Sequence, residues 1–177
     1  MPKSSNSGKR WIKNTVLEIF NKPMKILDVG CGRGTYKRLF KDVPFMYQSN
    51  WTGVEVWEPY IELFSLKSVY NTILNEDARK VNWDKLGIWD LVFMGDILEH
   101  MTKQEAQTLV DQCLPNTKYI VISIPIVHMS QGAEHGNPYE IHVKPDWTDQ
   151  EVLESFPNII KHHKEGKIGV YLLEGSL

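Results

Sequence analysis

The sequence predicts an α/β fold: a doubly wound sheet of seven strands, mostly parallel with the last strand antiparallel, and helices on both faces. Short apolar segments alternate with amphipathic ones along the chain, which is the pattern of a parallel sheet with crossover helices. The last two apolar segments, 159–163 and 168–173, are joined by a short turn at Gly166, too short for a crossover, so one strand runs antiparallel. With 177 residues, the chain has the length of a single domain, 1–177.

A helix and a strand are predicted first. Apolar residues at helical spacing form one stripe, which ends before Pro23: Ile12, Val16, Ile19 and Phe20. The strand 24–29 follows. We expect residues 1–9 to be a flexible tail, and we interpret the nearby basic residues as solvated: Lys3, Lys9, Arg10 and Lys13.

The alternation continues through the middle of the chain. Proline suits the first turn of a helix because its missing N–H has no partner there in any case. In order, the pattern predicts a helix over 35–40, a strand over 51–56, a helix with Pro59 in its first turn, and strands over 68–74 and 89–94.

Two capping patterns mark helices in the second half. Thr102 and Glu105 have the spacing of a capping box, and the helix behind them has an apolar inner face, made of Ala106, Leu109, Val110 and Cys113. The β-branched run 118–124 is the fifth strand, continuously apolar as expected for a strand covered on both faces. Thr148 and Glu151 repeat the capping spacing.

Composition and charge exclude several classes of protein. The net charge of −2 gives no overall field that would recruit nucleic acid. Cys31 and Cys113 are far apart, so neither a disulfide framework nor a four-cysteine zinc site is indicated, and we expect a cytoplasmic protein. No apolar run approaches the ~20 residues that span a bilayer, so we expect no membrane partner.

The most informative segment lies directly after the first strand. Gly30, Gly32 and Gly34 stand at alternate positions, where positive φ angles and missing side chains let the backbone close around a ligand. A dinucleotide fingerprint needs a small third residue where Thr35 stands, and a phosphate-binding P-loop needs a lysine that is missing here. Asp28 would repel a diphosphate but suits a cationic or hydroxyl-bearing ligand.

The run from Leu27 to Gly34, Leu-Asp-Val-Gly-Cys-Gly-Arg-Gly, closely resembles motif I of the class I S-adenosylmethionine-dependent methyltransferases. The resemblance covers roughly residues 24–174 and points to small-molecule members with a type 11/23-like methyltransferase domain. It implies a Rossmann-like sheet, S-adenosyl-L-methionine as cofactor and S-adenosyl-L-homocysteine as product. In that family, the loop wraps the methionine and ribose of the cofactor, which implies contacts from Asp28, Gly30, Cys31, Gly32 and Gly34.

Further positions match the same family. Glu55 follows the second strand, where family members bind both ribose hydroxyls with an acidic residue, and a carboxylate has the acceptors for a vicinal diol. Val56 or Trp57 would lie against the adenine. Asp77 and Ala78 resemble the adenine-binding motif after the third strand, with Glu76 as the alternative acidic partner.

The fourth predicted strand also ends in a family-like motif. Residues 90–100 resemble the corresponding segment, including the Leu-Glu-His ending that small-molecule members share. The resemblance implies that Gly95 and Asp96 border the methyl donor. We interpret His100 as a helix-start residue that is packed or hydrogen-bonded under the site.

The polar segment 125–147 is longer than ordinary connections and leaves the carboxyl end of a strand, where open α/β sheets bind ligands. We therefore expect it to be the lid on the acceptor side. The catalytic candidates are His142, which matches a histidine of similar methyltransferases, His128 and Tyr139. A metal set of His128, His135 and His142 with Glu134 or Glu140 is the alternative, but this spacing fits no compact ligand motif, so no metal is expected.

Methyl transfer from a sulfonium needs mainly alignment of the nucleophile, the methyl carbon and the sulfur, so a general base is optional. A small-molecule acceptor is predicted, because the chain shows no clear nucleic-acid module and lacks an Asn-Pro-Pro-Tyr type motif after the fourth strand. Two other functions stay open. One is a noncatalytic, methyltransferase-like binding or partner protein, and the other is an NAD(P)-dependent oxidoreductase, against which Asp28 argues. The oligomeric state is not predicted.

Overall fold

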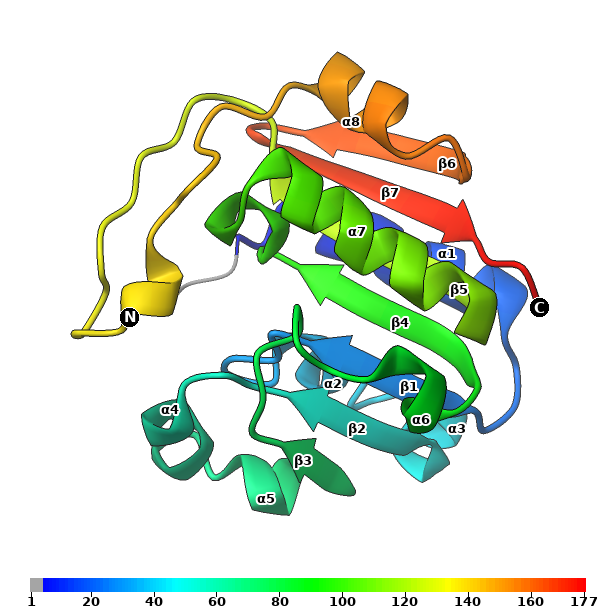
Figure 1. Cartoon of the computed structure of the whole chain (residues 1–177). Helices are drawn as coiled ribbons and strands as arrows, with labels where there is room; N and C mark the ends of the chain where they lie inside the picture. The colour runs from blue at the N-terminus through cyan, green and yellow to red at the C-terminus, as the bar shows by residue number, and fades with distance from the viewer. Residues whose placement is uncertain (1–4) are drawn as a thin grey trace.

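The computed structural model describes residues 5–177 as a seven-stranded sheet between two layers of helices (Figure 1). The sheet order is β3-β2-β1-β4-β5-β7-β6. The pairings among β1 to β5 are parallel, and β7 is antiparallel to both β5 and β6, which confirms the predicted fold. The strands are β1 (Lys25–Val29), β2 (Asn50–Val54), β3 (Thr72–Leu74), β4 (Trp89–Gly95), β5 (Thr117–Pro125), β6 (Ile159–Glu165) and β7 (Ile168–Glu174).

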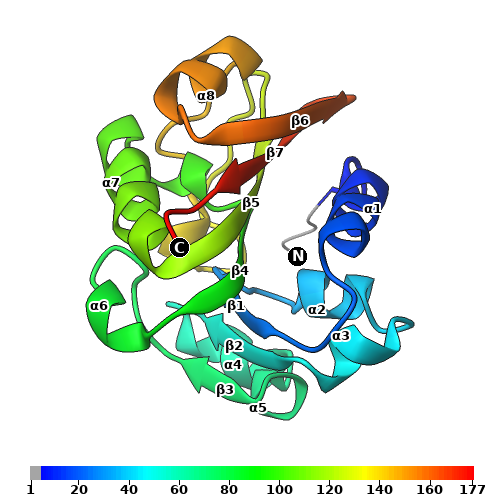
Figure 2. The same ribbon diagram turned by 90° about the vertical axis from the view of Figure 1, so that its right-hand side faces the viewer.

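The helices are divided between the two faces of the sheet, as the side view shows (Figure 2). One face carries α1 (Lys9–Ile19), α2 (Thr35–Leu39), α3 (Pro44–Gln48), α4 (Glu58–Leu63) and α5 (Leu66–Val69). The other face carries α6 (Trp83–Leu86), α7 (Lys103–Cys113) and α8 (Asp149–Ser155). Three 3-10 turns complete the described residues: η1 (Leu98–His100), η2 (Leu114–Asn116) and η3 (Pro138–Glu140). Every helix in this part of the chain is too short or too polar to cross a membrane.

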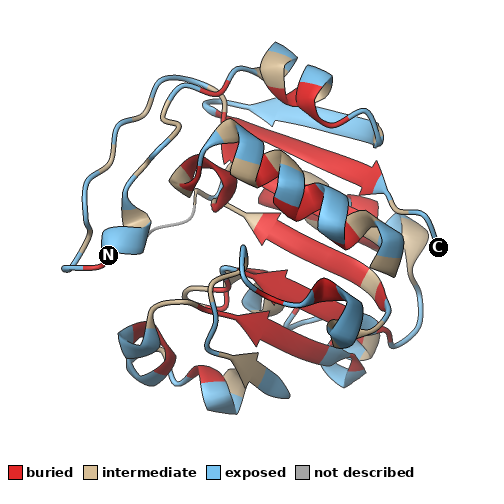
Figure 3. Ribbon diagram, viewed as in Figure 1, coloured by how far each residue is buried: buried red, intermediate tan, exposed pale blue. Residues whose placement is uncertain are grey.

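Each face of the sheet has its own apolar core. On one face, Phe93 of β4 stacks with Tyr36 and Trp51 at centroid distances of 4.6 and 5.8 Å. On the other, the inner residues of α7 are buried together with Trp147, as the sequence pattern predicts. Burial falls toward the sheet edges, and β6 is almost entirely exposed (Figure 3). The central strands are therefore held on both sides, which keeps their carboxyl ends in fixed positions.

The third predicted strand is shorter than expected. Of the range 68–74, only Thr72–Leu74 is extended, while the preceding Leu66–Val69 forms the short helix α5. Ser65 adopts a left-handed φ of 52° before this helix, and Tyr70 turns inward, where its hydroxyl reaches Asp28. Apolar residues in so short a segment suit a strand and a helix equally, so the burial of Tyr70 decides the local structure.

The amino end differs from the predicted tail. Residues 1–4, including Lys3, lie outside the described residues, but Lys9 begins α1 and is buried. Its ammonium group lies 2.7 Å from the Tyr36 hydroxyl and 3.9 Å from the Asp96 carboxylate. The interpretation of Lys9 as solvated is wrong, because Lys9 precedes Ile12 by three residues and shares its buried helical face.

Candidate active site

A cavity of about 550 Å³ opens at the carboxyl ends of the parallel strands. Its walls come from the glycine loop after β1, the ends of β2 and β4, the turn after β3 and the segment after β5. Eleven of the predicted site residues line it: Gly30, Cys31, Gly32, Glu55, Val56, Asp77, Ala78, Gly95, Asp96, Tyr139 and His142. The sheet topology thus gathers residues that are far apart in the sequence into one hollow.

The glycine loop is anchored on one side and open on the other. The backbone N–H groups of Gly30 and Cys31 donate to the Val54 carbonyl at 2.9 and 3.1 Å. Gly30 has a φ of +65°, and a Cβ there would collide with Ile97. Gly32 has a φ of +49°, and a Cβ there would meet only the Gly30 carbonyl, at 3.8 Å. The open backbone at Gly32 therefore gives a ligand close access to the loop.

Glu55 joins the glycine loop to the end of β2. One carboxylate oxygen accepts a hydrogen bond from the Gly32 N–H at 2.9 Å, and the other accepts from the Trp57 N–H at 2.8 Å. Burial raises the pKa of this carboxyl, while the two amide donors oppose the shift. Each oxygen keeps a lone pair, so Glu55 can still accept hydrogen bonds from two neighbouring hydroxyls.

Asp77 lines the cavity but already has a partner. The Arg79 guanidinium donates to its two carboxylate oxygens at 2.7 and 2.9 Å, and this contact lowers the pKa of Asp77. Arg79 also reaches Glu105 of α7 at 3.0 Å. A ligand at Asp77 would therefore share the carboxylate with Arg79. Ala78 and Glu76 stand beside it on the same wall.

Gly95 ends β4, Asp96 follows it, and both residues line the cavity. A Cβ on Gly95 would overlap the Tyr36 ring, so only glycine fits there. Asp96 has a left-handed φ of 56°, and its backbone N–H donates to the Ser123 carbonyl at 2.7 Å. Burial lowers the pKa of nearby Lys9, and the Asp96 charge opposes that shift. Backbone strain of this kind gathers at functional sites, where the surrounding packing maintains it.

The segment 125–147 contributes two of the three predicted catalytic residues. The Nδ1 atom of His142 lies 2.5 Å from the Met129 carbonyl oxygen, and its ring lies 5.0 Å from that of His100. Tyr139 is 41% exposed at the rim, with its ring 6.2 Å from the ring of Trp57. His128 does not line the cavity, because it is exposed on the outer part of the segment beside Ser130.

Asp28 and Gly34 also lie outside the cavity wall. Asp28 is buried beneath the loop, where the Tyr70 hydroxyl donates to it at 2.5 Å, and burial raises the pKa of its carboxyl to about 7. Gly34, with a φ of +71°, directly precedes α2 and faces Val69 and Tyr70. The direct cofactor contacts predicted for these two residues therefore need correction: both shape the loop from behind.

Several residues in and behind the cavity wall were not predicted. Tyr36 and Gln131 line the cavity, and Gln131 donates to the Glu140 carbonyl at 2.8 Å within the lid segment. Lys9 is buried behind the wall, where its ammonium group contacts the Tyr36 hydroxyl. The sequence contains a sign that Lys9 is buried, because its helical spacing places it on the apolar face of α1. It contains no such sign for Gln131, because the position of Gln131 depends on how the segment folds back on itself.

A mostly parallel sheet that carries a glycine loop and acidic strand ends around one cavity defines an α/β domain of the class I methyltransferase type. Residues 27–115 match the family model of the methyltransferase domain, which is half of the chain. The chain therefore belongs to the methyltransferase domain family, and the resemblance noted for motif I is confirmed.

Solved structures share the fold. The N-terminal domain of EvdMO1, with S-adenosylhomocysteine (SAH) bound, has a TM-score of 0.69 at 15% identity and covers 98% of this chain and 83% of its own. The plantazolicin methyltransferase BpumL in complex with SAH has a TM-score of 0.68 at 14% identity, with coverages of 96% and 83%. Magnesium protoporphyrin IX methyltransferase from Synechocystis PCC 6803 with bound SAH has a TM-score of 0.64 at 14% identity, with coverages of 95% and 83%. None of the curated proteins compared with this chain matches it.

Proposed function

We propose that this protein transfers the methyl group of S-adenosyl-L-methionine to a small-molecule acceptor bound in the same cavity, and releases S-adenosyl-L-homocysteine. The observation that carries the proposal is the contact between Glu55 and Gly32. It holds an acidic residue with spare acceptor capacity beside an open glycine loop, which suits a ribose with two free hydroxyls next to a cationic sulfonium. EvdMO1 and BpumL, which share the fold, hold SAH in their solved structures.

The proposed cofactor contacts follow the order of the strands. The glycine loop would hold the methionine and ribose portions, Glu55 the ribose hydroxyls, and the turn after β3 the adenine, while the end of β4 would border the methyl donor. The residues assigned to these contacts are Gly30, Cys31, Gly32, Glu55, Val56, Asp77, Ala78, Gly95 and Asp96. Asp28 and Gly34 would act on the cofactor only through the loop that they support.

The acceptor would bind between the end of β4 and the lid segment. His142 and Tyr139 line this side, and we propose that they position the acceptor for in-line attack on the methyl carbon. Alignment of this kind supplies up to roughly 7–11 kcal/mol of a barrier in favourable intramolecular cases. If the acceptor atom is a hydroxyl, a histidine can also take its proton.

The cavity volume supports a small acceptor. Pockets for small molecules and cofactors span roughly 300–1,000 Å³, and the cavity here is about 550 Å³. An acceptor that enters whole would be a compact molecule beside the cofactor. A larger acceptor would present only one end to the site.

Calorimetry with S-adenosylmethionine, SAH, NAD and NADP tests the cofactor assignment. We expect binding of the two sulfur compounds and none of the two dinucleotides. Tight NAD binding with no response to either sulfur compound would overturn the proposal in favour of an oxidoreductase. Retention of SAH without methyl transfer to any acceptor offered would favour the noncatalytic, methyltransferase-like protein.

A further inference from the structure

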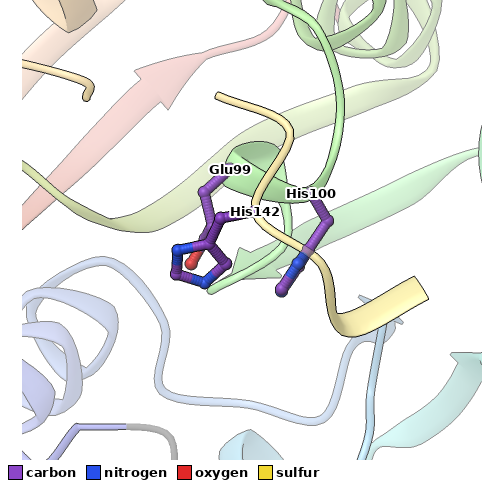
Figure 4. Close-up of side chains that lie close together, drawn as sticks. All are labelled: Glu99, His100 and His142. Carbon is purple, nitrogen blue, oxygen red and sulfur yellow. The ribbon is translucent and has the colours of Figure 1, made fainter. Parts of the chain in front are cut away.

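Three potential metal ligands meet at the acceptor side of the cavity. Glu99 and His100 come from η1 after β4, and His142 comes from the segment between β5 and α8 (Figure 4). One ligand atom of each residue lies within 4.8 Å of the others, and all three residues line the cavity. Among the described residues, these three form the group that is close enough to share one ion.

The Glu99 carboxylate has an unsatisfied oxygen. The residue is only 2% exposed, and its Oε2 atom is buried without a hydrogen-bond partner among the described residues. A buried carboxylate oxygen without a donor carries a desolvation penalty that the fold does not offset by itself. A cation bound at this position would supply the missing partner.

The two histidines have their lone pairs available for the same ion. The Nδ1 atom of His100 lies 3.2 Å from the Ile141 carbonyl oxygen, and that of His142 lies 2.5 Å from the Met129 carbonyl oxygen. A carbonyl oxygen only accepts, so Nδ1 carries the proton in both rings, and in the neutral imidazole Nε2 then keeps its lone pair. A backbone carbonyl that holds Nδ1–H is the usual outer-shell partner of a metal-binding histidine.

The surrounding charge is negative. Two acidic side chains, Asp96 and Glu140, and one cation, Lys9, lie close enough to act on the Glu99 charge. The nearby cation, Lys9, contacts Asp96 at 3.9 Å and the Tyr36 hydroxyl at 2.7 Å. A divalent cation would therefore find two further acidic side chains next to its ligands.

We propose that Glu99, His100 and His142 bind one divalent transition-metal ion at the wall of the cavity. Two imidazoles and one carboxylate form the ligand set of catalytic zinc sites and of non-haem iron(II) sites, both of which keep positions open for other ligands. Magnesium and calcium prefer oxygen ligands and fit this set less well. The open positions of the ion would face the acceptor side of the cavity.

This site also restricts the acceptor, and that part of the inference rests on the proposed function. A metal ion lowers the pKa of an oxygen that it binds, so the acceptor class is a hydroxyl-bearing molecule that is methylated on oxygen. In that reaction, the sulfur–methyl bond breaks as the oxygen–methyl bond forms. The sulfur keeps the electron pair of the broken bond. The hydroxyl proton leaves to solvent and not to a cavity histidine, because the Nε2 lone pairs of His100 and His142 would be bound to the ion.

Metal binding is tested without cofactor or acceptor. Protein stripped with a chelator is titrated with Zn²⁺, Mn²⁺ or Co²⁺ alone by calorimetry, and its metal content is measured by mass spectrometry after dialysis. We expect one equivalent of at least one of these ions. Loss of outer-shell partners lowers metal affinity roughly 10- to 100-fold, so loss of a ligand in Glu99→Gln, His100→Gln or His142→Gln should lower it at least about tenfold.

The control variants are His128→Gln and His135→Gln, which change exposed histidines of the same segment outside the cavity wall. Both should bind metal as the unchanged protein does. The absorption spectrum of bound Co²⁺ in the unchanged protein reports nitrogen and oxygen ligands and needs no variant, so a variant that fails to fold does not decide the result.

Three results would overturn the metal site. The first is no stoichiometric ion in the folded protein, and the second is an affinity in all three ligand variants equal to that of the unchanged protein. The third is loss of binding in His135→Gln but not in His100→Gln, which would assign the ion to the other histidines. Calorimetry with SAH on the same stripped protein separates this inference from the proposed function. SAH binding without metal binding removes only the metal site, and metal binding without SAH binding removes only the cofactor assignment.

Discussion

Glu55 combines two tasks in one side chain. Its two oxygens accept hydrogen bonds from the Gly32 and Trp57 amides, and the side chain lines the cavity of about 550 Å³. The carboxylate thus fixes the shape of the glycine loop before any ligand arrives. A preorganised acceptor of this kind loses little freedom on binding.

Replacement of this side chain should weaken cofactor binding. In Glu55→Ala, we expect the affinity for SAH to fall at least about tenfold, because hydrogen bonds to charged groups contribute roughly 1.5–3 kcal/mol. Calorimetry measures the change, and a thermal melt checks the fold. Glu62→Ala, which removes an exposed glutamate of α4, is the matched control. A folded Glu55→Ala protein with unchanged affinity would place the ribose contact elsewhere.

Asp28 should make stability depend on pH. Burial raises the pKa of this carboxyl from 3.8 to about 7, against the Tyr70 hydrogen bond. Between these two values, the folded protein keeps a proton that the unfolded chain has lost. Protonated Asp28 therefore contributes stability at low pH that is lost as the pH rises toward 7. Asp28→Asn removes the ionisation and keeps an acceptor for Tyr70.

The comparison uses urea unfolding of both proteins at about pH 5 and about pH 8. We expect the free energy of unfolding of Asp28→Asn, relative to the unchanged protein, to be higher at the upper pH. The pH dependence that comes from all other titratable groups is the same in both proteins and cancels in this difference. A difference that is the same at both values would show that Asp28 titrates in its ordinary range.

At the scale of elements, the sequence predicts those with a clear period or cap. The capping box of Thr102 and Glu105 is present at the start of α7, and Thr148 caps α8 as expected. The helices α3, α5 and α6 have only four or five residues, too few to show a period. Tertiary contacts hold such pieces in place: the Trp51 indole, for example, donates to the Met46 carbonyl of α3 at 2.9 Å.

The site residues also fall into those that the sequence predicts and those that it does not. Positions at strand ends, such as Glu55 and Gly95, follow from a local motif and the parallel topology. The pairing of His100 with His142 does not, because it depends on how the segment after β5 folds back over η1. The position of Asp28 beneath the loop, outside the cavity wall, depends on its hydrogen bond with Tyr70. No local sequence pattern indicates that Tyr70 turns inward.

Changes in the lid segment should slow methyl transfer without weakening cofactor binding. In His142→Ala, we expect the affinity for SAH to stay within about twofold, while methyl transfer to a confirmed acceptor slows by roughly 100-fold or more. Tyr139→Phe tests the rim hydroxyl in the same assay. His163→Ala, in the exposed strand β6, is the control. Full transfer in both lid variants would remove this segment from the acceptor wall.

The whole molecule is one sheet with a core on each face, and the cavity lies where loops from both layers meet. A ligand that bridges these loops binds only the folded chain. At a concentration of 100 times its Kd, SAH should add about 2.7 kcal/mol to the free energy of unfolding. For a chain of this length, that corresponds to a rise in Tm of roughly 5–11 °C.

Thermal melts with and without SAH measure this rise, with NAD at the same concentration as the control. We expect NAD to leave the Tm unchanged. The Glu55→Ala protein should show a smaller rise than the unchanged protein, because its affinity is lower. Equal shifts with SAH and NAD would indicate binding that does not distinguish the two classes of cofactor.

The direction of β7 decides where this protein can be tagged or immobilised. Ser5 and Ser7 line the cavity, so the amino-terminal part of the described chain begins beside the site. Because β7 is antiparallel to β5, the chain leaves the sheet near the amino end of β5, away from the cavity, and Leu177 is exposed there (Figure 1). A purification handle or surface linkage at the carboxyl end therefore leaves the entrance clear for binding experiments.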